Sequence, residues 1–147
     1  MIKYKWKNII NNEIPSNCEE LYCNYWNLHK LPELPKTLIK LYCYRNNLSY
    51  LPELPQTLQK LDCHYNKLSD LPELPQTLRM LLCNNNKLNE LPELPQTLQK
   101  LECDNNNIKY LSQHNCSIIK KLKYVKLLNN PFSVNFTDNQ EFILSLE

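Results

Sequence analysis

Apolar residues recur along most of this chain with a period of 20 residues. The segment Leu-Pro-Glu-Leu-Pro begins at residues 31, 51, 71 and 91, and the residues between these segments repeat with few changes. When each copy is numbered from its first apolar residue, positions 1, 4, 6, 11, 14 and 17 are apolar. The copies begin at Cys18, Leu38, Leu58, Leu78, Leu98 and Leu122. A fixed period of this length predicts a solenoid, in which each copy forms one turn and stacks on its neighbours.

Each copy predicts one short strand and one extended return segment. In Leu41-Tyr42-Cys43 the outer two residues are core positions and the middle one is not, and a period of two is typical of a strand. The return segment holds two prolines in five residues, as in residues 51–55. Proline excludes an α-helix there because it fixes φ and lacks an N–H donor. We therefore expect an α/β solenoid with short parallel strands on its concave side, an extended or polyproline-like convex side, and mild curvature.

The N-terminal end of the chain predicts a cap on the first copy. That copy begins at Cys18 and carries Trp26 where the others carry asparagine, and terminal repeats are commonly degenerate. We assign residues 1–17 to an N-terminal cap. Three of its residues alternate as an edge strand that would cover the open core of the first copy, namely Ile2, Tyr4 and Trp6.

The C-terminal end departs from the period as well. Residues 18–121 hold five copies, but the fifth is longer than the others and has residues 112–121 in place of the proline segment. Residues 122–147 form a final copy and a helical C-terminal cap, in which residues 137–140 have the pattern of a capping box. We expect the whole chain, residues 1–147, to be a single domain.

The repeated leucine positions and the proline-containing return segment resemble those of a known family. They resemble the 20-residue leucine-rich repeats of bacterial effector proteins, whose return wall has the same Leu-Pro-x-Leu-Pro, and similar repeats in giant-virus proteins. The resemblance is close over residues 18–111 and weaker as far as Phe132, and it departs in having cysteine at position 6, where those proteins usually have valine or leucine. It implies a solenoid of the leucine-rich-repeat type that binds other proteins on its concave or edge surfaces. Some effector relatives carry a ubiquitin-ligase domain after the repeats, an activity we do not expect because the chain ends soon after Phe132.

Composition and charge do not favour any one class of partner. The chain has 147 residues, is 42% hydrophobic and has a formal net charge of +2, which gives no general attraction to nucleic acid or anionic membranes. It shows no signal peptide and no apolar run long enough to span a bilayer. We therefore expect a monomer in the cytoplasm or in a host cytosol, without membrane insertion. One convex position is glutamate in four copies, at Glu33, Glu53, Glu73 and Glu93. We attribute this row of like charges to solvation, and a site for a basic partner is the alternative.

Asparagine has two expected structural roles. The chain has no glycine, so left-handed turn positions must be filled mainly by asparagine, the next most tolerant residue. Position 9 is asparagine in most copies, and its side-chain amide can satisfy buried backbone groups of the turn. The position-9 residues are Asn46, Asn66, Asn86, Asn106 and Asn130.

Cysteine recurs at position 6, in Cys23, Cys43, Cys63, Cys83 and Cys103. Because position 6 points into the predicted core, we interpret these residues as small hydrophobic core residues, reduced as is usual inside cells. Metal binding and disulfides are the alternatives, but in-register parallel strands hold the Cβ vectors side by side. Catalysis by Cys63 with His64 is disfavoured because adjacent strand residues face opposite sides. We expect no enzyme activity, no catalytic residue, no metal and no cofactor.

The concave strand face varies most between copies, at positions 3, 5, 7 and 8, where a solenoid can change what it displays without changing its core. Its N-terminal half gathers tyrosines with an arginine, a composition typical of binding hot spots. We predict that a partner protein, unidentified by the sequence, binds there. Ordinary exposed side chains are the alternative, because tyrosine also favours strands. The predicted partner-binding residues are Tyr22, Tyr25, Tyr42, Tyr44, Arg45, Asp62, His64 and Tyr65.

Lysines at position 3 suggest a second hypothesis. Lys40, Lys60 and Lys100 lie near tyrosines, and such a stripe can hold single-stranded nucleic acid by charge and stacking. Met80 interrupts the stripe. Four acidic residues on the same face would repel phosphate, namely Glu20, Asp62, Glu102 and Asp104. We therefore predict a non-enzymatic protein–protein interaction module, with nucleic-acid binding through the Lys/Tyr stripe as the less favoured alternative.

Overall fold

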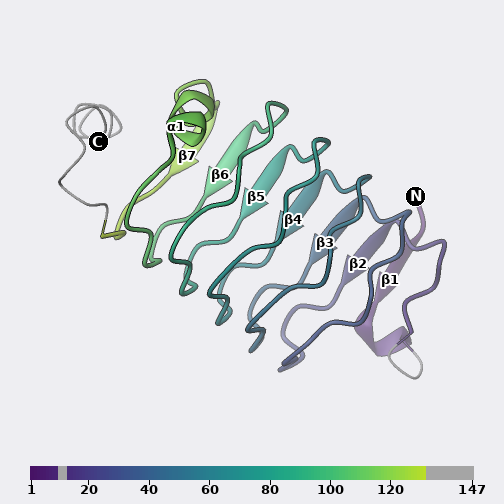
Figure 1. The fold of residues 1–147 in the computed structure, drawn as a ribbon. Helices are drawn as coiled ribbons and strands as arrows, with labels where there is room; N and C mark the ends of the chain where they lie inside the picture. Colours follow the sequence, from purple (N-terminus) through teal and green to yellow (C-terminus); the bar gives the residue numbers. More distant parts are fainter. Residues whose placement is uncertain (10–12, 132–147) are drawn as a thin grey trace.

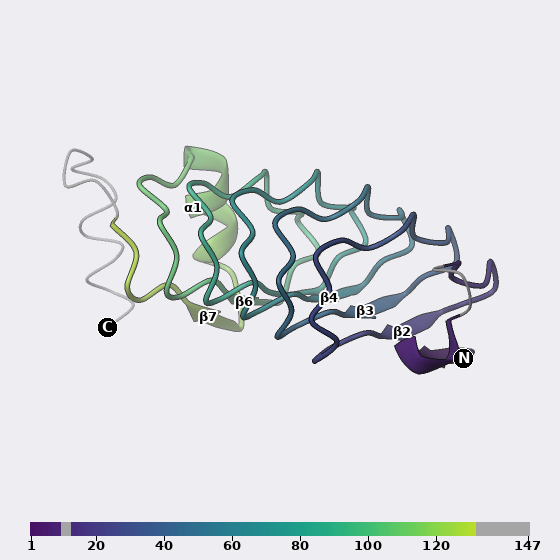
Figure 2. The same ribbon diagram turned by 90° about the horizontal axis from the view of Figure 1, so that it is seen from below.

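Seven short strands form one parallel sheet whose order follows the sequence (Figure 1). The computed structural model describes residues 1–9 and 13–131 of the chain. The strands are β1 (Lys3–Lys5), β2 (Glu20–Tyr22), β3 (Lys40–Tyr42), β4 (Lys60–Asp62), β5 (Met80–Leu82), β6 (Lys100–Glu102) and β7 (Tyr124–Lys126). A 3-10 helix, η1 (Trp6–Asn8), follows β1, and the α-helix α1 (Gln113–Ile119) precedes β7. Figure 2 shows the strands along one side of the coil and α1 on the other side, among the return segments.

The strands pair in register, so that each repeat position meets the same position across the sheet. Leu41 of β3 pairs with Leu21 of β2 on one side and with Leu61 of β4 on the other. A slip of one residue would turn every buried leucine toward solvent, so the hydrophobic pattern stabilises this register. The predicted solenoid of short parallel strands is confirmed.

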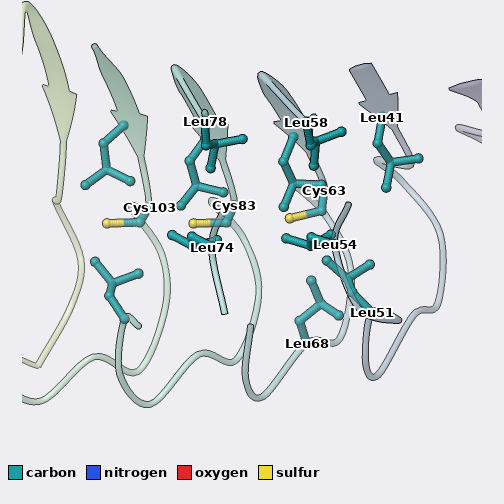
Figure 3. Packing of buried hydrophobic residues seen from close by; sticks show 14 of the residues in the cluster. Leu41, Leu51, Leu54, Leu58, Cys63, Leu68, Leu74, Leu78, Cys83 and Cys103 are labelled. Atoms are coloured by element: carbon teal, nitrogen blue, oxygen red, sulfur yellow. The ribbon is translucent and has the colours of Figure 1, made fainter. Parts of the chain in front are cut away.

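Leucine and cysteine side chains fill the space between the strands and the return segments. Figure 3 shows Cys63, Cys83 and Cys103 in a row along the solenoid, with leucines on either side of them. Each position-6 cysteine has an exposed fraction of 0%, in Cys23, Cys43, Cys63, Cys83 and Cys103. This burial confirms that position 6 points into the core.

The return segments of four repeats are neither helical nor stranded, as their prolines require. They are held to one another by a threonine that the sequence analysis did not single out. The Thr57 hydroxyl lies 2.7 Å from the Lys36 carbonyl oxygen and 2.8 Å from that of Leu38, and it donates its proton to this pair. Equivalent bonds, to carbonyls 21 and 19 residues earlier in the chain, are made by Thr37, Thr77 and Thr97. Each turn is therefore tied to the previous one on the wall that has no strand ladder.

The position-9 asparagines bridge consecutive turns. The Asn46 amide nitrogen donates to the carbonyls of Cys23 (2.8 Å) and Cys43 (2.9 Å). Its amide oxygen accepts from the backbone N–H groups of Trp26 and Leu28, both at 3.0 Å. Bonds of the same kind are made by Asn66, Asn86, Asn106 and Asn130. The predicted structural role of this row is confirmed.

The helix α1 replaces the return segment of the fifth repeat, which the sequence analysis did not predict. Ser112 caps it by accepting a hydrogen bond from the backbone N–H of Asn115. The Asn115 side chain is buried, accepts from the Leu94 N–H (2.8 Å) and donates to the Pro92 carbonyl (3.0 Å), so it fastens α1 to the fourth repeat. The C-terminal helix that we predicted from the capping box at 137–140 lies outside the described residues.

The strand β1 covers the open end of the first repeat. Tyr4 pairs with Leu21 and, like Trp6, packs partly buried against the core. Ile2 is 44% exposed and does not contribute to the cover that we expected of it. Neither α1 nor η1 is long and apolar enough to cross a membrane, and residues 1–9 and 13–131 contain no other helix.

Candidate interaction surface

The exposed side of β2–β7, which we call the strand face, is formed by positions 3, 5, 7 and 8 of each repeat. Positions 4 and 6 are buried, and side chains alternate along a strand, so positions 3, 5 and 7 point away from the core. Ring and cation contacts link seven of the eight predicted partner-binding residues into two adjacent groups on this face. We call them the tyrosine patch, and they are Tyr22, Tyr25, Tyr42, Tyr44, Arg45, His64 and Tyr65.

The first group is a stack at position 5. Tyr22 of β2 and Tyr42 of β3 are paired residues, and their ring centroids lie 4.6 Å apart with an interplanar angle of 7°. The Lys60 ammonium of β4 lies 4.7 Å from the Tyr42 ring centroid. Neighbouring strands are about 4.8 Å apart, close to the stacking distance of aromatic rings. The in-register repeat therefore produces the stack directly.

The second group surrounds position 7. Tyr44 stacks on His64 with centroids 4.6 Å apart and an interplanar angle of 9°. Tyr25 meets the Tyr44 ring edge-on at 5.4 Å, and Tyr65 meets the His64 ring edge-on at 5.5 Å. Burial raises the pKa of the Tyr44 hydroxyl above its usual range. Four rings from three consecutive repeats thus form one contiguous surface.

Asp62 is buried, although we predicted it as an exposed partner-binding residue. Its exposed fraction is 6%, and its carboxylate forms a hydrogen bond with His64 Nδ1. A partner on one ring nitrogen fixes the orientation of a histidine. Asp62 therefore orients the His64 ring that stacks on Tyr44, and we leave this buried residue out of the tyrosine patch.

Arg45 lies between two rings of this second group. Its guanidinium carbon is 4.6 Å from the Tyr65 ring centroid and 5.6 Å from that of Tyr25, within the range of cation–π attraction. Side chains at position 8 of three successive repeats therefore support one another along the solenoid.

Position 8 is left-handed in all six repeats. The last three repeats place asparagine there, as expected for a chain without glycine: Asn85, Asn105 and Asn129, each with φ of 56°. The first three repeats place Tyr25 (φ 65°), Arg45 (52°) and Tyr65 (52°) there instead. Among the described residues asparagine thus fills most left-handed positions, as expected, with Asn27 as the fourth, but it does not fill position 8 of the first three repeats. A bulky side chain in this conformation costs about 1–2 kcal/mol, because Cβ approaches the following carbonyl oxygen.

A buried carboxylate at position 3 anchors the N-terminal end of the strand face. Glu20 is 1% exposed, and its oxygens lie 2.8 Å from the Lys40 ammonium and 3.3 Å from that of Lys3. The bond from Lys40, with further bonds from Tyr22 and Lys3, lowers the pKa of Glu20 to about 2, although burial opposes the shift. The Tyr22 hydroxyl donates to Glu20 (2.8 Å), which raises the pKa of Tyr22 to about 12. Glu20 therefore presents no uncompensated negative charge to a ligand.

Comparison with known proteins places this architecture in a family. YopM from Yersinia enterocolitica WA-314 has a similar structure, with a TM-score of 0.75 and 37% sequence identity over 80% of this chain and 25% of that one. A Shigella effector leucine-rich-repeat domain is similar with a TM-score of 0.73 and 37% identity, over 82% of this chain and 53% of that one. The chain is a leucine-rich-repeat protein whose repeats are similar to those of these bacterial effectors. No protein-family model and no curated protein matches it.

This leucine-rich-repeat chain spans about a quarter of the YopM chain and about half of the Shigella domain. The solenoid that we predicted from the repeat is therefore confirmed as a fold, and the resemblance to effector repeats is confirmed with it.

The C-terminal half of the leucine-rich-repeat sheet carries a smaller cluster that the sequence analysis missed. Tyr124 of β7 is 40% exposed, and the ammonium groups of Lys100 and Lys126 lie 4.3 Å and 5.6 Å from its ring centroid. Lys100 also pairs with Glu102 at 2.8 Å. The copy that begins at Leu122 puts Tyr124 at position 3 and Lys126 at position 5, and β7 pairs with β6 in that register, so the sequence carried the signal for these contacts. The half-buried residues of β5 separate this cluster from the tyrosine patch.

Chemistry at the cysteine row finds no support in this geometry. Burial raises the pKa of the Cys63 thiol well above its usual range, and the side chain lies in the core while His64 lies on the strand face. Within residues 1–9 and 13–131, no group of three or more His, Cys, Asp or Glu side chains is arranged to hold a metal ion.

Proposed function

We propose that this leucine-rich-repeat protein is a non-enzymatic interaction module that binds a partner protein through the tyrosine patch. The observation that carries the proposal is the contact among tyrosine, histidine and arginine side chains from neighbouring repeats, in two adjacent groups on one face. Tyrosine and arginine are, with tryptophan, the residues most enriched in interface hot spots, where they combine large contact area with hydrogen-bonding groups.

Preorganisation of these side chains supports the proposal. Stacked rings such as Tyr22 on Tyr42 and Tyr44 on His64 already occupy one arrangement in the free protein. Binding then costs less side-chain entropy than it would for freely rotating residues. The core positions beneath the patch, positions 4 and 6, are leucine and cysteine in each of the first three repeats, so the patch can be specific without any change to the fold.

The nucleic-acid alternative is not favoured by the charges on the strand face. Of the three position-3 lysines, Lys40 is bonded to Glu20 and Lys100 to Glu102, each at 2.8 Å. A lysine that is already paired releases fewer counterions on meeting phosphate, and this release supplies most of the affinity for nucleic acid.

We also propose that the protein works in a reducing compartment, the cytoplasm or a host cytosol. None of the seven cysteines forms a disulfide and all are buried, a usage typical of intracellular proteins. We expect it to act as a monomer and without a cofactor.

The patch is tested by Tyr42→Ala combined with Tyr44→Ala, measured on a partner captured from cytosol and then purified. We expect binding to weaken by about 30-fold or more, which is about 2 kcal/mol, because two central rings are removed. Loss of two ring stacks should also lower the stability by about 1–2 kcal/mol, so circular dichroism must show that the variant is folded at the assay temperature.

Two controls accompany this variant. Tyr124→Ala removes a tyrosine from the same sheet outside the patch, and Glu53→Gln with Glu73→Gln alters exposed residues on the opposite wall. Both should bind like the wild type. If a control abolishes capture and the Tyr42/Tyr44 variant does not, the docking surface lies elsewhere on the solenoid.

A further inference from the structure

The three non-asparagine residues at position 8 occupy their left-handed turns at a cost to stability. Tyr25 and Tyr65 are exposed by 63% and 46%, so core packing does not account for either ring. Asparagine serves the same turn in the later repeats, at Asn85, Asn105 and Asn129. A strained conformation retained where a better residue is available indicates a functional constraint. The strain lies within the tyrosine patch and is absent from position 8 of the later repeats.

The charges around these residues indicate what they would bind. Within the part of the chain that the structure describes, neither Arg45 nor Lys60 has a carboxylate within salt-bridge distance. Two acidic residues of this half of the strand face already have partners, since Glu20 is bonded to Lys3 and Lys40, and Asp62 to His64. In this half of the face, Arg45 and Lys60 therefore contact aromatic rings but no carboxylate, and no free carboxylate opposes them.

We propose that Tyr25, Arg45 and Tyr65 form an anchoring site for a carboxylate, so that the partner protein docks through an acidic segment. This inference rests on the proposed function and names the class of ligand for the same surface. A guanidinium offers five N–H donors in a planar fork that matches a carboxylate, and the flanking rings hold Arg45 in place for it. Lys60, over the Tyr42 ring, supplies a second positive charge for a neighbouring acidic residue.

The site is tested by giving the first three repeats the residue that the later repeats have, in the variant Y25N/R45N/Y65N. Relief of three strained turns should raise Tm by a few °C, even after the cation–π contacts are lost. The reciprocal change Asn85→Tyr, which creates the same strain outside the patch, should lower Tm. A fall in Tm for the triple variant would show that these residues serve stability, and would overturn the proposal.

The binding probe is a phage-displayed random dodecapeptide library, selected in parallel on the wild-type protein and on the triple variant. Peptides enriched on the wild type should be rich in Asp and Glu. Synthetic copies should lose about tenfold or more in affinity for the triple variant, and a similar factor when their acidic residues are changed to amides. Tyr124→Ala, the matched control outside the patch, should bind the peptides normally.

The outcomes separate this inference from the proposed function. Selected peptides that are not acidic, or that bind the triple variant as tightly as the wild type, overturn the carboxylate anchor. If those peptides still lose affinity with Tyr42→Ala and Tyr44→Ala, the proposed function stands without it; if they do not, both fall. If single-stranded oligo-dT displaces the peptides at about 150 mM salt, the cations bind phosphate and the carboxylate anchor is wrong. A selection that yields no binder also counts against the anchor.

Discussion

The position-6 thiols show how one residue type serves the whole solenoid. Each sits between the two walls with no exposed surface, where cysteine behaves as a small hydrophobic residue. Burial raises the pKa of Cys23 to about 12, and that of Cys43 well above its usual range. Because the thiolate is the nucleophilic and metal-binding form, desolvation of this kind makes the row chemically inert.

Replacement of Cys63 by serine tests this packing role. Serine is nearly isosteric but brings a hydroxyl without a partner into the core, so Cys63→Ser should lower the free energy of unfolding by about 1–3 kcal/mol. Cys63→Val keeps the site apolar and should cost less. Urea unfolding measures both changes, and alkylation should label the wild-type row slowly until denaturant is added. Equal stability of the two variants would contradict a dry, fully packed site.

Side-chain hydrogen bonds from one repeat to the next hold the turns between the strands. The position-9 asparagine satisfies a carbonyl of its own turn, a carbonyl of the preceding turn and an N–H of that preceding turn, as Asn106 does for Cys103, Cys83 and Leu88. In the return segments each threonine hydroxyl donates to two carbonyls, as Thr57 does to those of Lys36 and Leu38. Stability therefore resides in the contacts between repeats, as expected for a solenoid.

Adjacent asparagines provide a matched test of this bridging. Asn106→Ala removes three buried bonds and leaves backbone groups without partners, so it should destabilise the protein by about 2–4 kcal/mol. Asn107 is exposed, and Asn107→Ala should change stability by less than about 0.5 kcal/mol. Chemical denaturation compares the two. Similar effects at both positions would show that the bridge contributes little.

The helix α1 marks where an element could not be predicted. Proline gave a strong signal against helix in four return segments, but residues 112–121 lack it and carry only a serine cap and a short apolar pattern. The decisive interaction is the buried Asn115 side chain on the fourth repeat, which depends on tertiary contact. A helix of this length is not stable alone, so its sequence signal is weak.

At the scale of the whole molecule, features that recur with the repeat were predictable and features that break it were not. Register, core positions and the gathering of tyrosines on one face all follow from equal spacing. The burial of Asp62 and the left-handed conformation of Tyr25, Arg45 and Tyr65 depend on neighbours that differ from repeat to repeat. The proposed carboxylate site depends on these exceptions to the repeat, and it stays a prediction.

The N-terminal end of the solenoid should be its acid-sensitive part. Glu20 links Lys3 of β1 to Lys40 of β3, and the bond from Lys40 with those from Tyr22 and Lys3 lowers its pKa to about 2, against a usual value of 4.5. A carboxyl whose pKa is lower in the folded state stabilises the fold above its unfolded pKa and loses that contribution as pH falls through its folded pKa. Stability from this group should therefore decline as the pH falls from about 4.5 toward 2. Terminal repeats have one neighbour only, so the loss should be local.

Hydrogen exchange at pH 5 and pH 3, corrected for the intrinsic rates, measures this effect segment by segment. Amides of β1 and β2 should lose protection before those of β5 and β6. Glu20→Gln should be less stable near neutral pH, because its amide cannot form the ion pairs, and should abolish the extra loss at pH 3. Glu33→Gln, on the exposed convex side, is the control and should leave the profile unchanged. Acid loss that begins at β5 and β6, or that persists in Glu20→Gln, would mean that another carboxyl governs the N-terminal end.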